Sequence, residues 1–240
     1  MSRFAERLRD RFYDPQTHPY RVLERRIDGL VSRETSTLLD AGCGRSAPML
    51  RRFLGRVPRL IGVELVDFRG VPPGIETYKS DLANLPLPDA GVDLIMSRSV
   101  FEHLTDPPAV YRELARILKP GGRLVFLTAN MWDYGTQVAR LVPNRWHAAI
   151  VKATEGRAEE DTFPTAYLTN TRRDVDRLSR EAGLRVERFE YLSQYPNYLM
   201  FNGALFALGM CYEKLVSAFK PLEFLRGWIL VTLVKPQSGA

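Results

Sequence analysis

The chain has 240 residues, of which 45% are hydrophobic and 26% are charged, and its formal net charge is +6. This length fits one α/β domain with elaborations, the composition is ordinary for a soluble protein, and the sequence shows no internal repeats or low-complexity segments. The basic excess is consistent with a solvated arginine-rich surface, or with a face for anionic substrates, membrane lipid or nucleic acid. No nucleic-acid-binding motif is present, so we expect no nucleic-acid partner.

The first 34 residues are predicted to form two short helices, because Pro15 and Pro19 interrupt their recurring apolar positions. Charges are spread through the N-terminal residues, without the apolar core of a signal peptide. The two cysteines, Cys43 and Cys211, are far apart in the sequence and lack metal-ligand spacing. We therefore expect reduced thiols, no bound metal and a cytoplasmic location.

A glycine turn follows the first long apolar run. Residues 38–44 read Leu-Leu-Asp-Ala-Gly-Cys-Gly, which predicts a strand, a tight turn and the start of a helix. Gly42 and Gly44 let the backbone pass close to a ligand at the carboxyl end of a strand. The same glycines fit a loose dinucleotide fingerprint, but Asp40 would place a carboxylate beside the diphosphate. A ligand with a cationic amino group and a sulfonium, such as S-adenosylmethionine, would instead be attracted to Asp40.

Further strands are expected at 59–64, 75–79, 92–97 and 123–129. Residues 48–55 are predicted to form a short helix after the glycine turn. The glycines and prolines of residues 70–74 indicate that the second crossover helix is short or absent. A helix that opens with Pro107 is expected to follow the cap Asp106.

Five elements between residues 36 and 130 together resemble the class I S-adenosylmethionine-dependent methyltransferases with a type 11-like methyltransferase domain. In chain order these elements are residues 38–44, 61–64, 80–88, 92–104 and 118–124. The resemblance implies a Rossmann-like, doubly wound α/β fold. Its seven-stranded sheet would be mostly parallel with the last strand antiparallel, and helical insertions would be added to it. S-adenosylmethionine is the implied cofactor, and the helices of residues 1–34 would cover its pocket.

Roles for individual residues follow from the resemblance. Glu64 would bind both ribose hydroxyls with its two carboxylate oxygens, and Asp81 would accept a hydrogen bond from the adenine amino group beside the Leu82 backbone. The strand that ends near Ser97 would bring backbone carbonyls close to the amino group of the cofactor. The predicted cofactor-binding residues are therefore Asp40, Gly42, Gly44, Glu64, Asp81, Leu82 and Ser97.

Glu102 and His103 form an acid–histidine pair beside the predicted cofactor site. Histidine is the side chain best suited to act as a general base near neutral pH, which makes His103 the candidate catalytic residue. The same pair is common in the resembled subfamily whatever the substrate, and this favours a role in holding the loop. Both interpretations stay open.

Two segments outside the core, 131–170 and 194–225, are expected to be insertions that form the acceptor site or a lid. The first holds Trp132, Tyr134 and Trp146, which suit a pocket lining or a packed subdomain. Within the second, residues 198–212 are unusually apolar but too short for a membrane span. This stretch is interpreted as a lid helix, as a core helix, or as an interfacial anchor with peripheral membrane contact through 198–220.

The sequence thus predicts a single methyltransferase domain over residues 1–240, with a cofactor-binding core at 36–130. The acceptor is expected to be a small molecule, a glycan or a lipid-linked intermediate, and the protein to be cytoplasmic or peripheral to the inner face of the membrane. One alternative is a non-catalytic or membrane-peripheral binding module on the same scaffold, which would be expected to lack Asp40, Glu64 or Asp81. A second alternative, an NAD-dependent oxidoreductase, is disfavoured by Asp40.

Overall fold

The computed structural model describes residues 2–141 and 163–237. Contacts divide the chain into two compact units. The first comprises Met1–Val22, Ala129–Thr165 and Tyr191–Ile229, and the second comprises Leu23–Thr128, Ala166–Glu190 and Leu230–Ala240. The predicted core at 36–130 lies almost entirely in the second unit.

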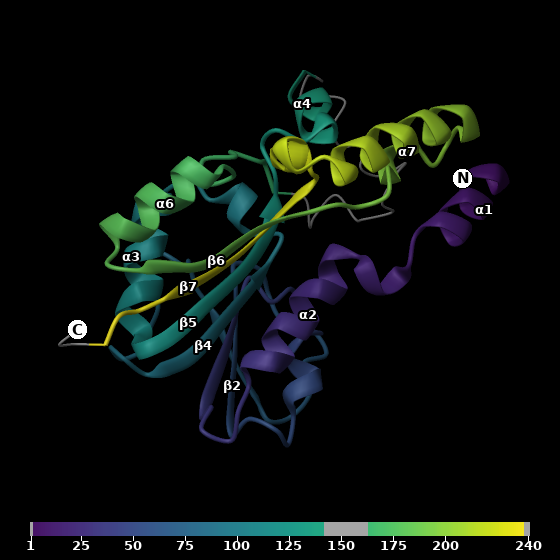
Figure 1. Cartoon of the computed structure of the whole chain (residues 1–240). Helices are drawn as coiled ribbons and strands as arrows, with labels where there is room; N and C mark the ends of the chain where they lie inside the picture. The colour runs from purple at the N-terminus through teal and green to yellow at the C-terminus, as the bar shows by residue number, and fades with distance from the viewer. Residues whose placement is uncertain (1, 142–162, 238–240) are drawn as a thin grey trace. The chain divides into compact units, whose positions relative to one another are not determined.

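A seven-stranded sheet is the main feature of the described chain, with the strand order β3-β2-β1-β4-β5-β7-β6 (Figure 1). The first five strands pair in parallel. The last strand in the sequence runs antiparallel, as shown by the reciprocal backbone bonds that Lys235 makes with Gly121 and Gly122. The predicted Rossmann-like α/β fold is therefore confirmed. The strands are β1 (Thr37–Ala41), β2 (Arg59–Glu64), β3 (Ile75–Lys79), β4 (Val92–Arg98), β5 (Leu118–Ala129), β6 (Arg185–Leu192) and β7 (Trp228–Val234).

The central strands are buried on both faces, which explains their nearly continuous apolar sequences. Asp40 on β1 is level with Gly62 on β2 and with Met96 on β4. Because these strands are parallel, their carboxyl ends meet at one edge of the sheet. β1 and β4 are neighbours although β2 and β3 separate them in the sequence, so the strand order reverses at this point. Ligands of open α/β sheets bind at such a reversal.

Three α-helices contribute to the second unit, namely α2 (Pro19–Leu30), α3 (Pro107–Ile117) and α6 (Arg172–Glu181). The Asp106 carboxylate accepts a hydrogen bond from the Ala109 N–H and caps α3, as the sequence predicts. Thr171 caps α6 in the same way by accepting from the Asp174 N–H. α3 and α6 pack against each other (Figure 1).

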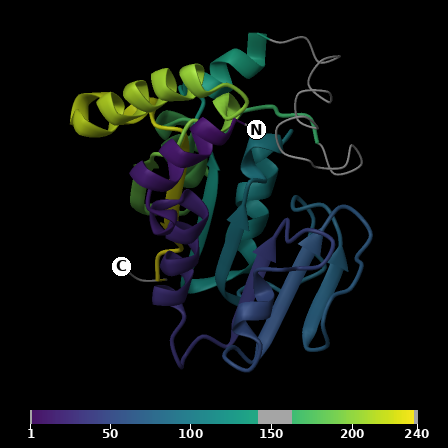
Figure 2. The ribbon, with the colours of Figure 1, turned by 90° about the vertical axis from the view of Figure 1, so that its right-hand side faces the viewer.

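The first unit contains the helices α1 (Arg3–Phe12), α4 (Tyr134–Leu141) and α7 (Gly203–Ala218). α1 lies alongside α7 (Figures 1 and 2), where Ala5, Met200 and Phe206 form a buried apolar cluster. Short 3₁₀-helices occur at Pro15–Thr17, Leu50–Phe53, Phe101–His103, Asn197–Leu199 and Lys220–Leu225.

Two predicted elements need correction. Residues 48–55 form only the 3₁₀-helix Leu50–Phe53, whose buried Leu50 and Phe53 anchor it to the core. β5 begins at Leu118 rather than at residue 123, because Lys119–Gly122 continue the strand instead of leaving the sheet, and Gly121 and Gly122 exchange backbone bonds with Lys235.

The apolar stretch 198–212 also differs from its predicted bounds. Its helix begins later, at Gly203, because the Asn202 side chain accepts from the N–H groups of Ala204 and Leu205, and it continues to Ala218. No helix in the described part of the chain is long and apolar enough to cross a bilayer.

Candidate functional site

The candidate site lies at the carboxyl ends of β1, β2, β3 and β4, all within the second unit. The glycine turn follows β1, Glu64 ends β2, Asp81 follows β3, and Ser97 is the penultimate residue of β4. The pairing of these four strands brings the sequence-predicted residues to one edge of the sheet.

The glycine turn is held against β2 and leaves no room for a side chain at position 42. The N–H groups of Gly42 and Cys43 both donate to the Val63 carbonyl, at 2.9 and 3.0 Å. Gly42 has φ +77°, and a Cβ atom there would lie 2.2 Å from Val100 Cγ2. Glycine is therefore required at position 42 by its dihedral angle and by the close approach of the loop after β4.

Asp40 is a buried carboxylate that is only 2% exposed. Its pKa is raised to about 7, chiefly because the carboxyl group is buried; the Arg98 guanidinium opposes this rise and the nearby charge of Glu64 adds to it. A bound cation at this position would stabilise the charged form of Asp40, and this is the chemistry expected for a ligand amino group. Arg98 was missed by the sequence analysis, although its place at the end of a buried strand was a visible signal.

The Glu64 side chain points back toward the glycine turn. Its Oε2 accepts from the Gly44 N–H and its Oε1 from the Leu65 N–H, both at 2.8 Å. Each carboxylate oxygen has a second lone pair, so Glu64 can accept from two hydroxyl groups without losing these bonds. A Cβ atom at Gly44 would meet no atom within 4 Å, which leaves open space over this part of the turn.

Asp81 and Ser97 already have partners within the protein. The Asp81 Oδ1 accepts from the Ala83 N–H at 2.9 Å and fixes the turn after β3, in which Leu82 is buried. The buried Ser97 hydroxyl donates to the Ala41 carbonyl at 2.7 Å and ties β4 to β1. Any contact of Ser97 with a ligand would therefore involve its backbone.

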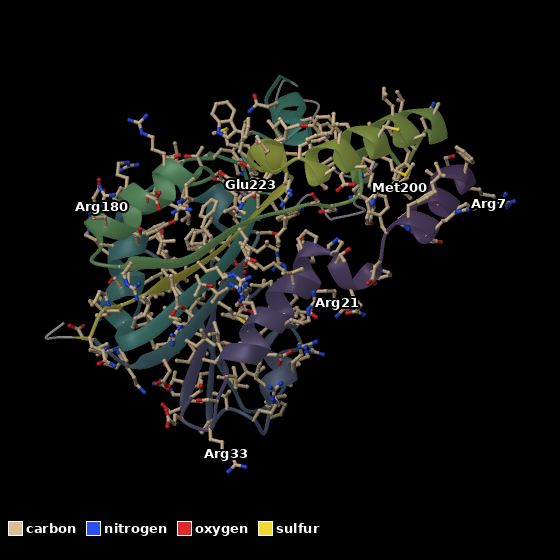
Figure 3. The ribbon with its side chains drawn as sticks, viewed as in Figure 1. Arg7, Arg21, Arg33, Arg180, Met200 and Glu223 are labelled. Atoms are coloured by element: carbon tan, nitrogen blue, oxygen red, sulfur yellow. The ribbon has the colours of Figure 1, made fainter. Side chains whose placement is uncertain are left out.

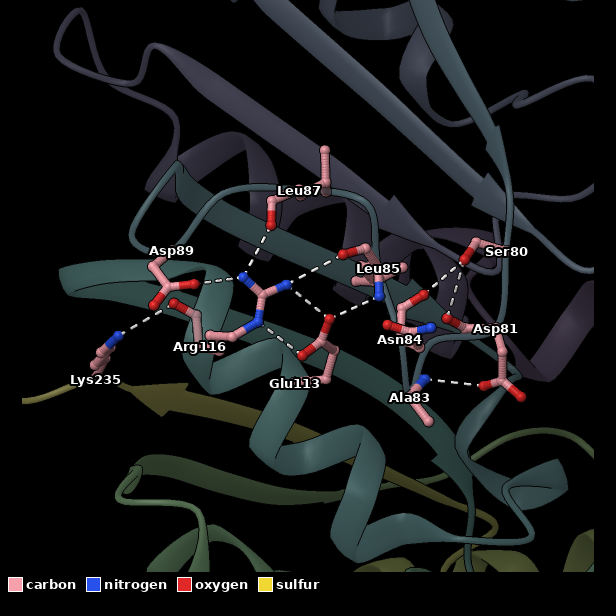
Figure 4. A network of polar contacts seen from close by, with 10 residues as sticks. All are labelled: Ser80, Asp81, Ala83, Asn84, Leu85, Leu87, Asp89, Glu113, Arg116 and Lys235. Atoms are coloured by element: carbon pink, nitrogen blue, oxygen red, sulfur yellow. Dashed lines mark hydrogen bonds and ion pairs between the residues drawn. The ribbon is translucent and has the colours of Figure 1, made fainter.

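Arg116 on α3 holds the loop that continues from the Asp81 turn (Figure 4). Its guanidinium donates to the carbonyls of Leu85 and Leu87 and to both carboxylate oxygens of Glu113. Glu113 in turn accepts from the Leu85 N–H at 2.6 Å. Planar, bidentate bonding of this kind needs arginine rather than lysine. The sequence analysis did not identify this loop clamp. Its signal was an acid and an arginine three residues apart on a predicted helix.

We expect the Arg116→Ala substitution to loosen residues 80–90 and to lower the free energy of unfolding by about 1–2 kcal/mol, because several charge-assisted bonds are lost. Hydrogen exchange of these residues, followed by mass spectrometry, should become faster. Arg123→Ala is the matched control, since Arg123 makes an equally bidentate pair with Glu187 on another part of the sheet. Equal exchange of residues 80–90 in the two variants would contradict the clamp.

Glu102 anchors the loop that carries His103. The Glu102 side chain is buried and its Oε2 accepts from the Thr128 hydroxyl at 2.7 Å, while its carbonyl accepts from the N–H groups of Ala166 and Tyr167. Thr128 Oγ1 also accepts from the Asn170 side chain. Glu102 thus acts as a structural anchor, whereas catalysis by the half-buried His103 stays a prediction.

The described residues hold no cluster of histidine, cysteine and acidic side chains that could bind a metal ion. Cys43 is buried in the glycine turn, and burial raises the pKa of its thiol far above the ordinary value, so the thiol is protonated at neutral pH. Among the predicted aromatic residues of the insertion, Tyr134 packs edge-on against Tyr212, and Trp132 is exposed. Trp146 lies outside the described residues.

Comparison with known proteins matches residues 39–126 to a family described as the methyltransferase domain. The 27-O-demethylrifamycin SV methyltransferase of Amycolatopsis mediterranei is 28% identical over 73% of this chain and 63% of its own length. A Mycobacterium tuberculosis protein named as a probable S-adenosylmethionine-dependent methyltransferase is 36% identical over 39% of this chain and 35% of its own length. The chain therefore spans less than two thirds of these curated relatives.

Among solved structures, geranyl diphosphate C-methyltransferase from Streptomyces coelicolor, in complex with Mg²⁺, geranyl diphosphate and S-adenosyl-L-homocysteine, superposes with a TM-score of 0.54. The match covers 90% of this chain and 79% of that one at 18% identity. At this identity the likeness shows a shared fold.

Proposed function

We propose that this chain, whose residues 39–126 match the methyltransferase-domain family, is a class I S-adenosylmethionine-dependent methyltransferase. It would transfer the sulfonium methyl group of S-adenosylmethionine to an oxygen, nitrogen or carbon nucleophile. The observation that carries the proposal is the buried Asp40 beside the glycine turn, with Glu64 at the end of the next strand. These two acids would bind the amino group and the ribose of the cofactor, respectively.

The proposed reaction is an in-line displacement. The carbon–sulfur bond of the cofactor would break with its electron pair on sulfur, leaving neutral S-adenosylhomocysteine. The acceptor atom would form the new bond to the methyl carbon and give up its proton to a base or to solvent. Because the sulfonium is already activated, the work of the protein is to align the two reactants and to exclude water. Asp40 would orient the amino-acid end of the cofactor, Glu64 its ribose, and Asp81 with the Leu82 backbone its adenine.

His103 is proposed as the base that accepts a proton when the acceptor must lose one early. Its loop is fixed by Glu102 and by Phe101, which stacks on Phe126 with ring centroids 4.0 Å apart. A rigid loop would hold the imidazole in one place, as general-base catalysis requires.

The acceptor is proposed to be a small molecule, a glycan or a lipid-linked intermediate. The named relatives support the first class, because their names specify a rifamycin and geranyl diphosphate. The aromatic and apolar sequences of the segments 131–170 and 194–225 favour an amphiphilic guest. The alternative of a non-catalytic module is weakened by the presence of Asp40, Glu64 and Asp81 together.

Calorimetric titration tests the cofactor assignment. We expect the full chain to bind S-adenosylhomocysteine and not NAD, because Asp40 attracts an amino group and repels a diphosphate. Binding of NAD alone would overturn the proposal in favour of an oxidoreductase, and binding of neither ligand would favour the non-catalytic module.

The same preparation can then be incubated with cell extract and methyl-labelled cofactor to find the acceptor. The His103→Asn variant is tested in parallel with the wild-type chain. Loss of label transfer with unchanged S-adenosylhomocysteine affinity would support His103 as the general base. Retained transfer would leave His103 with the loop-holding role alone.

A further inference from the structure

α7 presents an apolar face that nothing in the described structure covers. Phe206, Gly209 and Val216 are buried on one side of the helix, while Leu208, which is 69% exposed, and Leu215 lie on the opposite side. A helix that is apolar on all sides is normally enclosed, and a contiguous exposed apolar patch marks an interaction site. We define the α7 face by its exposed members Phe201, Leu205, Leu208, Leu215 and Phe219.

α1 packs beside α7 and adds two aromatic side chains next to this face. A Cβ atom at Gly203 would lie 2.6 Å from Phe4, and the Lys214 ammonium donates to the Phe12 carbonyl at 3.3 Å. Phe4 and Phe12 are both about half exposed. The contacts at both ends of α1 make the two helices a single apolar surface.

Cations flank the surface, whereas the exposed acid of α1, Asp10, is paired with Arg9 and the acid of α7 is turned inward. α1 exposes Arg3, Arg7 and Arg11 at intervals of one turn, and Arg7 projects away from the ribbon (Figure 3). Lys214 and Lys220 are exposed at the C-terminal half of α7 and just beyond it. By contrast, the acidic residue of α7, Glu213, is buried and accepts from the Tyr13 hydroxyl at 2.9 Å. The α7 face is therefore apolar and bordered by positive charge.

This charge pattern discriminates between possible occupants. A second copy of the chain placed symmetrically on the same face would bring Lys214, Lys220 and the α1 arginines against their own copies, which is unfavourable. An anionic lipid surface satisfies both features, because the apolar side chains enter the acyl boundary while the cations meet lipid phosphates. We propose that the α7 face, with Phe4 and Phe12 of α1, docks this protein on an anionic membrane surface, with α7 lying in the plane of the interface.

The proposal is tested by flotation of the full chain with vesicles of phosphatidylcholine, alone or mixed with phosphatidylglycerol. We expect co-flotation with the mixed vesicles, weakened by added salt, and little with phosphatidylcholine alone. Each of the substitutions Leu208→Ser and Leu215→Ser should reduce the affinity for mixed vesicles by about tenfold, since a buried leucine side chain stabilises such a contact by at least that factor. Leu168→Ser is the matched control, because Leu168 is similarly exposed but belongs to the other unit.

A second measurement uses a dye attached to a cysteine that the wild-type chain already contains. Cys211 is exposed on α7 and Cys43 is buried, so an environment-sensitive nitrobenzoxadiazole dye can be attached at Cys211. We expect its emission to shift to the blue when mixed vesicles are added. Binding of S-adenosylhomocysteine without vesicles serves as the folding control, and because docking needs no methyl transfer, the two proposals can fail separately.

Three results would overturn the docking proposal. The first is an absence of co-flotation together with an unshifted dye. The second is equal binding of the leucine variants and the wild-type chain. The third is a dimer in sedimentation that Leu208→Ser dissociates, because the α7 face would then be covered by a second copy.

Discussion

Replacing Asp40 by asparagine is expected to lower the affinity for S-adenosylhomocysteine at pH 8 by about a hundredfold or more, because a buried ionic partner of the ligand amino group is lost. The substitution keeps the size of the side chain, so the glycine turn and β1 should be unchanged. Isothermal titration calorimetry gives the affinity, and circular dichroism confirms that the variant is folded.

The wild-type affinity should also depend on pH. Burial places the pKa of Asp40 at about 7 in the unliganded protein, so at pH 6 most molecules must release a proton before they bind the cationic amino group. We expect binding to be about tenfold weaker at pH 6 than at pH 8, and proton release on binding to be detectable from calorimetry in two buffers. Asp40→Asn should remove this pH dependence.

The raised pKa of Asp40 also affects the stability of the unliganded chain. Whereas ligand affinity should rise with pH, this stability should fall with pH. The pKa of Asp40 in the folded chain lies above its unfolded value of 3.8. The contribution of Asp40 to the free energy of unfolding is therefore most favourable below about pH 4 and is lost as the pH rises through 7. Asp40→Asn should therefore raise the melting temperature at pH 8. Asp106→Asn is the control, since asparagine still caps α3. Equal affinity of wild type and Asp40→Asn at both pH values would refute the assignment.

The Glu64→Gln substitution is expected to weaken S-adenosylhomocysteine binding by roughly tenfold to a hundredfold, because hydrogen bonds from the ribose hydroxyls to a charged acceptor are lost. The amide can still accept one bond from the Gly44 N–H, so the turn should keep its conformation. Calorimetry on the wild-type and variant proteins measures the effect.

A ligand comparison separates ribose recognition from support of the turn. An analogue of S-adenosylhomocysteine without the two ribose hydroxyls should bind wild type weakly and Glu64→Gln about equally weakly. If the variant still prefers the natural ligand by the wild-type factor, Glu64 supports the turn and does not bind the ribose. Glu76→Gln on the adjacent strand is the control, because Glu76 pairs with Arg59 at the surface.

Local sequence determined the elements whose signals are contained in a few residues. The bounds of β2 and β3 were predicted as the structure has them, and the caps Asp106 and Thr171 each bond within four residues. The glycine turn was predicted for the same reason, since positive φ at Gly42 and Gly44 is a property of the residue type.

Features that depend on contacts between distant segments were not predictable in this way. The clamp of Arg116 on Leu85 and Leu87, the influence of Arg98 on Asp40, and the bonds of Glu102 to Thr128 join residues separated by 26 positions or more. The exposed side of α7 could not be predicted either, because the few polar residues of this mostly apolar helix do not form a distinct polar face.

By itself, the sequence indicated the strands and the glycine turn from apolar periodicity and residue chemistry, and its resemblance to a known family implied the mostly parallel fold and the acids that the proposed cofactor site requires. Only the tertiary structure decided which of these groups lie together, how far burial shifts the pKa of Asp40, and which side of α7 faces solvent. The physical reason is that burial and electrostatic environment are properties of the neighbours in space, and residues far apart in the chain supply most of those neighbours.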